Sequence, residues 1–483
     1  MDSGRGAREE EGATGNGVFR RKRFGAVVLL LAATALSGPA LAETVGGALV
    51  KAYLNNPDIN QQRAAVRAAD ENVPKANAGY LPHIAATADA GVSHANANAF
   101  VTSGTSQSEL NVAYGTLPRG YGVELNQNVF DGNKTLNSIR QAESQVLGSR
   151  EQLRNTEQNT LLTGLTAYMD VLRDTAILDL DRNNVDVLRE QLRETRDRFT
   201  VGEVTRTDVA QSEASLSSAQ ATAISAESTL ESSIARYRQV IGDQPTSLAP
   251  VRPLTKPLPP NLPQAISVSQ VEHPAIVASV HGVDAAQLQI KIAESALYPQ
   301  IGVTASVAQR FDLSNTPGLR AFVGTIAGQI TIPIFQGGSE YASTRQAKES
   351  ATQQELSVDS VRNQVRAAVV AAWGANESSI GVVRAARAAV SANEVALQGV
   401  REEAKVGQRT TLDVLNAQQA LLQARTTLVQ AEHDQVVNSY QLLSAVGRLN
   451  VPTLGLAVAE YDPRVHFNQV KNKWFGLRTP DGK

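Results

Sequence analysis

The chain is built twice, and this duplication constrains its fold more than any other feature of the sequence. Val201-Gly202 recurs further along the chain as Val406-Gly407. The same spacing relates Phe130 to Phe335, Arg140 to Arg345, Asp208 to Asp413 and Gly242 to Gly447, whereas Pro57 and Pro82 recur at a larger spacing as Pro274 and Pro299. The spacing therefore shortens after Pro82, which predicts that the first copy has the longer loop at this point.

The two copies are separated by a segment that contains seven prolines, residues 243–264. Clustered prolines are typical of surface connectors. We therefore divide the chain into a first structural repeat, 43–242, a second structural repeat, 265–447, and a C-terminal tail, 448–483.

Residues 1–42 have the layout of an N-terminal extension and signal peptide. A basic cluster at 20–23 precedes an apolar run at 25–36 and the small-residue site Ala40-Leu41-Ala42. The apolar run is too short for a transmembrane helix. We expect cleavage before Glu43, and Val18 is a candidate for the true translation start.

Each repeat contains two long proline-free stretches, for which we predict helices over 134–199 and 205–241 and over 340–404 and 410–446. Apolar residues recur every seven positions, which indicates coiled-coil packing. The heptad positions are Val171, Leu178, Val185, Leu192 and Phe199 in the first repeat and Leu415, Leu422, Val429, Val436 and Leu443 in the second. A plain coiled-coil filament would show the same pattern.

Alternating apolar and polar residues precede the long helices and predict strands over about 82–94, 119–130, 299–311 and 320–335. Strands of about ten residues suit a tilted membrane span. A half-buried soluble sheet alternates identically. Four strands are too few to close a barrel, since closure takes about eight or more. A membrane-spanning sheet would therefore require several chains.

The composition argues against several classes of function. The 45 basic and 47 acidic side chains give a net charge of −2, so no basic field favours nucleic acid as a partner. The absence of cysteine excludes disulfides, thiolate metal sites and a lipid anchor on cysteine. The six histidines lack zinc-ligand spacing, and we find no nucleotide, hydrolase or metalloprotease motif. We therefore expect no enzyme, cofactor or metal.

The two helix breaks resemble those of TolC-family outer-membrane exit ducts. The first break has the sequence RFTVGEVTRTDV at 198–209, and the second has VGQRTTLDVLNA at 406–417. The duplication, the strand pairs and the segment KWFGLR at 473–478 fit the same family. The resemblance implies a mixed α and β fold: a trimeric, twelve-stranded outer-membrane β-barrel, with four strands from each chain, continued by a periplasmic α-helical coiled-coil tunnel.

The family resemblance also implies a function. Such a homotrimer is the outer-membrane channel of a tripartite export system, which passes drugs or secreted polypeptides to the exterior through a gated periplasmic entrance. Its expected partners are outer-membrane lipid, a periplasmic adaptor (membrane fusion) protein and an inner-membrane ABC or proton-driven transporter. Two alternatives remain: a soluble periplasmic coiled-coil adaptor or scaffold, and a binding or degradative enzyme on a helical scaffold.

Specific residues take roles from the same resemblance. Asp413 would form a ring of carboxylates at the periplasmic gate, and Arg409 would hold the gate closed against Thr207 and Asp208. The adaptor would contact the helix tips at Val201, Gly202, Glu203, Val406, Gly407 and Gln408. Each of these residues also has a simpler interpretation. Asp413 could stabilise a helix N-terminus, Arg409 could be a solvated surface residue, and the tip residues could simply form turns.

Overall fold

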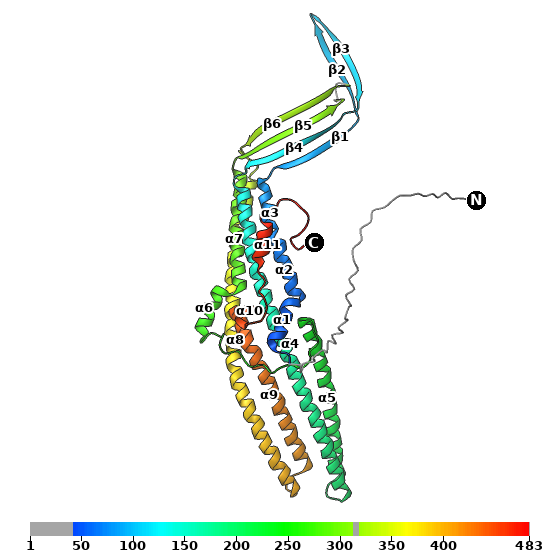
Figure 1. Ribbon diagram of the computed structural model, residues 1–483, viewed down its shortest axis with the longest axis vertical. Coiled ribbons are helices and arrows are strands. Elements are labelled where there is room, and N and C mark those ends of the chain that lie inside the picture. Colours follow the sequence, from blue (N-terminus) through cyan, green and yellow to red (C-terminus); the bar gives the residue numbers. More distant parts are fainter. Residues whose placement is uncertain (1–41, 313–317, 483) are drawn as a thin grey trace, which may run out of the picture. The chain divides into compact units, whose positions relative to one another are not determined.

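A computed structural model describes residues 42–312 and 318–482 of the chain (Figure 1). The predicted signal peptide, apart from Ala42, lies outside the described residues. Ala42–Lys483 forms one structural unit.

The first repeat begins with helices, continues into strands and ends with two long helices. The order is α1 Val45–Asn55, α2 Pro57–Asp70, α3 Asn72–Asn77, the 3-10 turn η1 Ala78–Tyr80, β1 His83–Ala90, β2 Ser93–Ser103, β3 Ser106–Thr116, β4 Arg119–Phe130, α4 Lys134–Thr200 and α5 Arg206–Ile241. Asn56 caps α2 through its side chain, and Pro57 occupies the first helical position, where no backbone N–H is needed.

The second repeat follows the same order without the additional strand pair. It consists of α6 Leu262–Glu272, α7 Pro274–Glu294, η2 Ser295–Leu297, β5 Gln300–Phe311, β6 Arg320–Thr331, α8 Ser339–Lys405 and α9 Thr411–Val446. The long helices have 67 and 36 residues in both repeats. The strand predicted to end at 335 was drawn too long. It ends at Thr331, shortly before Pro333, which has no N–H to donate to a sheet.

The four strands β1, β4, β5 and β6 form one antiparallel sheet in that order (Figure 1). Val123 lies between Ala86 and Val307 in register, so the apolar positions share one face. The opposite face is more polar. On it, Arg310 forms an ion pair with Asp89 (2.6 Å) across Gly120, where a Cβ atom would approach Arg310 Cδ to 2.7 Å.

The first repeat carries a hairpin where the sequence predicted only a longer loop. Strands β2 and β3 pair with each other in a separate two-stranded sheet. The strand predicted over 82–94 is therefore wrong only over 91–94, because β1 ends at Ala90 and β2 begins at Ser93. The surplus residues pair their backbone groups with each other along the two strands.

The helical core lies where α4 packs against α1, α2 and α9. Four of the five predicted heptad positions of α4 are buried, whereas Phe199 at its end is 44% exposed. The tail adds α10 Val451–Leu454 and α11 Pro463–Val470, and Val451 joins the same core. Among the described residues, no helix is both long and apolar enough to cross a membrane.

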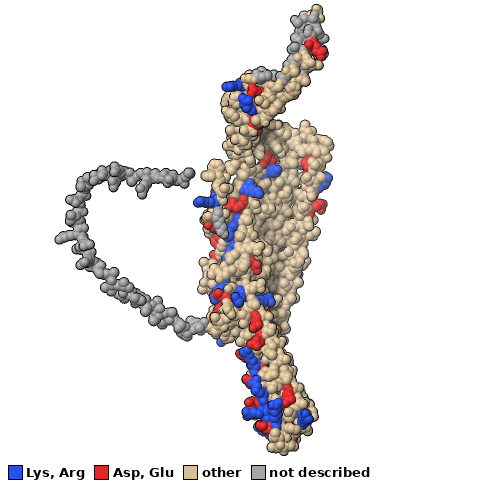
Figure 2. Space-filling view, turned by 90° about the vertical axis from the view of Figure 1, so that its right-hand side faces the viewer, with Lys and Arg blue, Asp and Glu red and all other residues tan. Residues whose placement is uncertain are grey.

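Below this core, the chain forms two helical hairpins. Helix α4 pairs with α5, and α8 pairs with α9 (Figure 1). The hairpins lie side by side through contacts between α4 and α9. Figure 2 shows Lys, Arg, Asp and Glu side chains gathered toward the hairpin tips. The two tips are the places where the chain reverses direction, and they carry the predicted gate and adaptor residues.

Candidate functional site: the paired hairpin tips

The two tips have nearly the same backbone. At the first tip, Gly202 adopts φ +80°, its N–H donates to Phe199 O (3.0 Å), and the N–H of Glu203 donates to Arg198 O (3.0 Å). This hydrogen-bond pattern closes a helix with a left-handed residue, which favours glycine. The tight turn thus ends α4 and points the chain back along itself.

The second tip repeats this geometry. Gly407 adopts φ +76°, its N–H donates to Ala404 O (3.2 Å), and the N–H of Gln408 donates to Glu403 O (2.9 Å). The residue before each glycine is an exposed valine: Val201 is 71% exposed and Val406 is 70% exposed. Each tip therefore presents one apolar side chain at its apex.

Both return helices start with a capping box. Thr205 receives a hydrogen bond from the N–H of Asp208 (3.3 Å) and donates its own N–H to Asp208 Oδ2 (2.8 Å). Thr410 and Asp413 form the same pair of bonds (3.2 and 2.9 Å). Each box satisfies two backbone donors that a helix start otherwise leaves free. Thr205 and Thr410 were not predicted as caps, although the spacing T-x-x-D signals this cap.

The capping bonds also set the charge of the two aspartates. Hydrogen bonds from the side chain and backbone of Thr205 hold the pKa of Asp208 below its usual value. The pKa of Asp413 is lowered by hydrogen bonds from the backbone and side chain of Thr410. Both carboxylates thus stay ionised near neutral pH. Within a single chain, Asp413 therefore has the helix N-terminal role that was the alternative to a ring of carboxylates.

At each tip an exposed ion pair joins the end of the long helix to the turn, and its polarity is reversed between the repeats. At the first tip, Arg198 at the end of α4 binds Glu203 in the turn (3.1 Å). At the second, Glu403 at the end of α8 accepts from Arg409 in the turn (2.8 Å). The predicted contact of Arg409 with Thr207 and Asp208 is therefore not made within one chain, where Glu403 takes its place.

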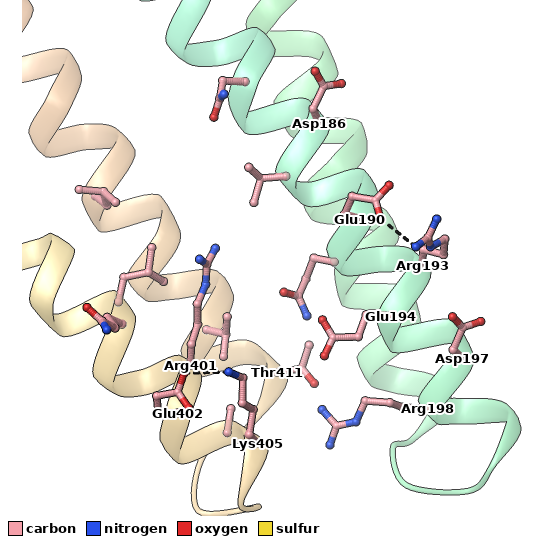
Figure 3. A pocket seen from close by; sticks show the side chains of 18 of the residues that line it. Asp186, Glu190, Arg193, Glu194, Asp197, Arg198, Arg401, Glu402, Lys405 and Thr411 are labelled. Atoms are coloured by element: carbon pink, nitrogen blue, oxygen red, sulfur yellow. Dashed lines mark hydrogen bonds and ion pairs between the residues drawn. The ribbon is translucent and has the colours of Figure 1, made fainter.

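A groove of about 1260 Å³ separates the two hairpins near their tips (Figure 3). Helix α4 lines one wall, and the ends of α8 and α9 line the other. Seven acidic and four basic side chains line it. The labelled side chains of Glu194 and Arg198 face Arg401 and Lys405 across the gap in Figure 3. The groove is thus a charged surface with an acidic excess.

Nothing at this site suggests catalysis. Among the described residues, no group of three or more His, Asp or Glu side chains is placed to hold a metal ion. The described tip residues serve as caps, turns and ion pairs. What the arrangement can do is end two coiled coils with equivalent turns and expose them together.

The fold is that of outer-membrane efflux channels. The Campylobacter jejuni CmeC outer membrane channel superposes with a TM-score of 0.73 at 16% identity, over 88% of this chain and 89% of that one. The sequence model of the family "Outer membrane efflux protein" matches residues 48–243 and 265–448. The protein belongs to this family, so the resemblance to TolC-like ducts is confirmed.

Two relatives support the same conclusion. The outer membrane efflux protein BepC of Brucella suis is 44% identical over 96% of this chain and 98% of its own length. The outer membrane protein TolC of Escherichia coli is 25% identical over 89% of this chain and 87% of its own. The protein is therefore a non-enzymatic transport protein of the outer membrane with a large periplasmic portion. The alternatives of a soluble adaptor and of an enzyme were wrong.

Proposed function

We propose that the protein is the outer-membrane channel of a tripartite export system and works as a homotrimer. The observation that carries this proposal is the duplication, in which each repeat contributes two strands to one open sheet and one helical hairpin to the tips. Strands β1 and β6 form the two edges of the sheet, and among the described residues each pairs with a strand on one side only. The unpaired backbone groups of an edge strand can pair with a strand of another chain, and three copies of four strands would close a twelve-stranded barrel.

The outer helices support the same assembly. Helix α8 exposes Leu356 (65%), Val382 (50%) and Val395 (71%), and α5 exposes Ile224 (68%). Apolar side chains that are exposed on a long helix gain stability when another helix covers them. Neighbouring protomers placed edge to edge would cover α5 and α8 and complete a tunnel. Light scattering of detergent-extracted protein should give three protomers, and a stable monomer would contradict the proposal.

The tips would form the gated periplasmic entrance. Three copies of Asp413 around an axis would attract cations, as rings of carboxylates do in channels. Arg409 is exposed enough to exchange Glu403 for Thr207 and Asp208 of a facing tip in the closed trimer. A gate that opens by moving these tips matches the known repertoire of helix shifts at subunit interfaces.

An adaptor protein would dock on the tips. Val201, Gly202 and Glu203 at one tip and Val406, Gly407 and Gln408 at the other are all exposed, and the acidic groove lies between them. A helical hairpin of a periplasmic adaptor fits such a surface, and an inner-membrane ABC or proton-driven transporter would supply the energy. The Brucella relative is named an efflux protein, whereas a more distant Pseudomonas aeruginosa relative, 27% identical, is named an alkaline protease secretion protein, so the names favour efflux over protein secretion for this chain.

Planar-bilayer conductance tests the gate. Arg409→Ser is expected to raise single-channel conductance, whereas Arg387→Ser should leave it unchanged. Arg387 is a matched control because it also forms an exposed ion pair, with Glu432 (2.8 Å), on the α8–α9 hairpin. Asp413→Asn is expected to weaken cation preference and block by multivalent cations. An Arg409→Ser channel with unchanged conductance would show that this residue does not close the pore.

A deletion strain tests the export function. Loss of the duct is expected to raise sensitivity to several unrelated toxic compounds, and the full-length gene should restore tolerance. Loss of a secreted protein without any change in drug tolerance would instead assign the duct to polypeptide secretion. Unchanged tolerance and unchanged secretion, in a strain without a second duct, would contradict the proposal.

A further inference from the structure

The segment that follows α11 exposes three large apolar side chains. Trp474 is 75% exposed, Phe475 is 77% exposed, and Leu477 is fully exposed. The rings of Trp474 and Phe475 pack edge to face with centroids 5.4 Å apart. Scattered exposed apolar residues are ordinary, but a contiguous group of three points to a surface that covers it.

This segment is a loop held in place at several points. Asn77 of α3 donates to the carbonyl of Lys471 (3.2 Å), and Lys473 Nζ donates to the carbonyl of Arg478. Further along, Asp481 forms an ion pair with Arg67 of α2 (3.6 Å). The three apolar side chains are therefore presented by an anchored loop, which we call the 471–481 loop.

The loop lies where the helices give way to the sheet. A cavity of about 390 Å³ is lined by Tyr80 and Leu81 on one side and by Lys473 and Trp474 on the other. Strand β1 begins just after Leu81, at His83. Figure 1 shows the C-terminal segment beside α3, next to the end of the sheet. The loop therefore sits at the level at which β1 starts.

The same end of the sheet carries other exposed aromatic residues. Tyr80 is 48% exposed, Tyr298 before β5 is 54% exposed, and Phe335 after β6 is 80% exposed. Aromatic side chains concentrate at the membrane–water interface, where one part of the ring is apolar and the other meets headgroups. Trp474 and Phe475 extend this set of aromatic residues beyond the strands.

The charges around the loop fit an anionic surface. Lys471, Lys473 and Arg478 flank the apolar residues, and Asp481 is engaged by Arg67. Long cationic side chains keep their charge among headgroups while their stems cover apolar surface. Basic residues close to an anionic leaflet are attracted to it. The alternation of bases and aromatics is that of an interfacial anchor.

We propose that the 471–481 loop is a membrane-interface anchor, which inserts Trp474, Phe475 and Leu477 among the anionic phospholipid headgroups of the periplasm-facing leaflet. The proposal rests on the proposed barrel, since it takes the start of β1 as the membrane boundary. The loop is not part of the sheet, and its insertion fixes how deeply each protomer lies in the membrane. It also joins the position of α2 and α3 to the membrane, because Asn77 and Arg67 hold the loop.

Tryptophan fluorescence tests the anchor directly, because the chain has only two tryptophans, Trp373 and Trp474. In Trp373→Phe, Trp474 is the sole reporter. We would reconstitute this full-length variant in vesicles of phosphatidylethanolamine and phosphatidylglycerol whose acyl chains are brominated close to the headgroup. We expect a blue shift relative to the denatured chain and loss of emission to these lipids, with weaker loss when the bromines lie at the bilayer centre.

The matched control is Trp474→Phe, which leaves Trp373. Trp373 lies in α8 beside the buried cluster of Ala372 and Val369, within the helical region. Its emission should not respond to either brominated lipid. Quenching of Trp474 by aqueous acrylamide without quenching by lipid would overturn the anchor. Protection of Trp474 from both quenchers would overturn it as well and assign the loop to a contact between protomers.

A second variant tests the charges. Substituting Lys471, Lys473 and Arg478 together by glutamine is expected to reduce lipid quenching of Trp474 in vesicles that contain phosphatidylglycerol, and to leave it unchanged with phosphatidylethanolamine alone. Lys405→Gln at the hairpin tip is the control and should have no effect. Trimer mass and conductance are measured on the same samples. If they are normal and the quenching is absent, the anchor fails while the proposed channel stands.

Discussion

The two repeats share their tips but not their cores. The tips correspond residue by residue in their backbone hydrogen bonds, with Gly202 and Gly407 at φ +80° and +76°. Higher in the same helices, equivalent positions differ: Leu165 of α4 is fully buried, whereas Val370, its counterpart in α8, is 45% exposed. Helix α4 is covered by α1, α2 and α9 within its own chain, and α8 is left as an outer helix.

This difference shows what duplication preserves. Turn geometry is fixed by local residues, so two copies with the same glycine and the same capping box fold alike. Core burial depends on which elements surround a helix, and α4 and α8 have different neighbours. The second repeat therefore depends more on other copies of the chain for the burial of its apolar residues.

The largest effect should come from the two equivalent core positions. Leu165→Ala removes a fully buried side chain from the main core and should cost about 2–5 kcal/mol. Val370→Ala, at the equivalent exposed site, should cost no more than about 0.5 kcal/mol in the isolated chain. Thermal unfolding of both variants measures the difference. A comparable loss at position 370 in the assembled protein would reveal burial of α8 by a neighbouring protomer.

The next largest effect is a pH dependence of stability at Glu157. Its equivalent in the second repeat is Arg362, where no such dependence is expected. Burial raises the pKa of Glu157 from 4.5 to about 7, against the opposing charge of Arg63 and with Glu460, Arg154 and Tyr53 nearby. The folded chain thus holds an extra proton between these two values, and stability falls as pH rises through that window. Above pH 7 the buried charge is a full cost.

Glu157→Gln should therefore stabilise the protein at pH 8 by about 1–3 kcal/mol and have little effect below pH 4.5. Arg362→Gln is the matched change, because Arg362 is exposed and pairs only loosely with Asp359 (3.6 Å). It should change stability by less than about 0.5 kcal/mol at either pH. Unfolding midpoints from pH 4 to pH 8 check this. A flat difference across that range would refute the shifted pKa.

The tip glycines should respond equally. No atom lies within 4 Å of a Cβ built on Gly202 or Gly407, so substitution by alanine meets only backbone strain. Left-handed backbone costs about 1–2 kcal/mol for a residue with a side chain. Gly399 in α8 is the control: it has equal space but helical backbone, and alanine there should stabilise by up to about 1 kcal/mol. Amide hydrogen exchange at each tip measures these local changes, and unequal losses at the two tips would break the equivalence.

The smallest effect belongs to the reversed ion pairs. Double-mutant cycles on Arg198 with Glu203 and on Arg409 with Glu403 should each give about 0.2–1 kcal/mol, because both pairs are solvent-exposed. Both couplings should shrink at high salt. Similar coupling energies for the two pairs would show that it does not matter to tip stability which partner lies on the helix and which in the turn. A much larger coupling for the second pair in the trimer would indicate that Arg409 is shielded at a constriction.

Local sequence patterns predicted the long helices correctly. Heptad spacing and the lack of proline placed α4, α5, α8 and α9 to within about a residue at each end, because those signals are local and periodic. The valine–glycine pairs located both tips for the same reason, since a left-handed residue is needed wherever a helix turns back tightly. The existence of β1, β4, β5 and β6 was also predicted, but the residues at which β1 and β6 end were not.

The pairing of the surplus residues of the first repeat, and the partners of the charged side chains, depend on tertiary contacts. The longer loop of the first repeat pairs as β2 and β3, which its weak alternation did not reveal. Arg409 meets Glu403 because the turn brings together residues on either side of it, a contact that depends on the path of the chain through Gly407. Likewise, Trp474 lies beside Tyr80 although the two are far apart in the sequence, because α11 packs along α2 and directs the chain there. Local patterns fix elements, but packing between distant elements decides which side chains meet.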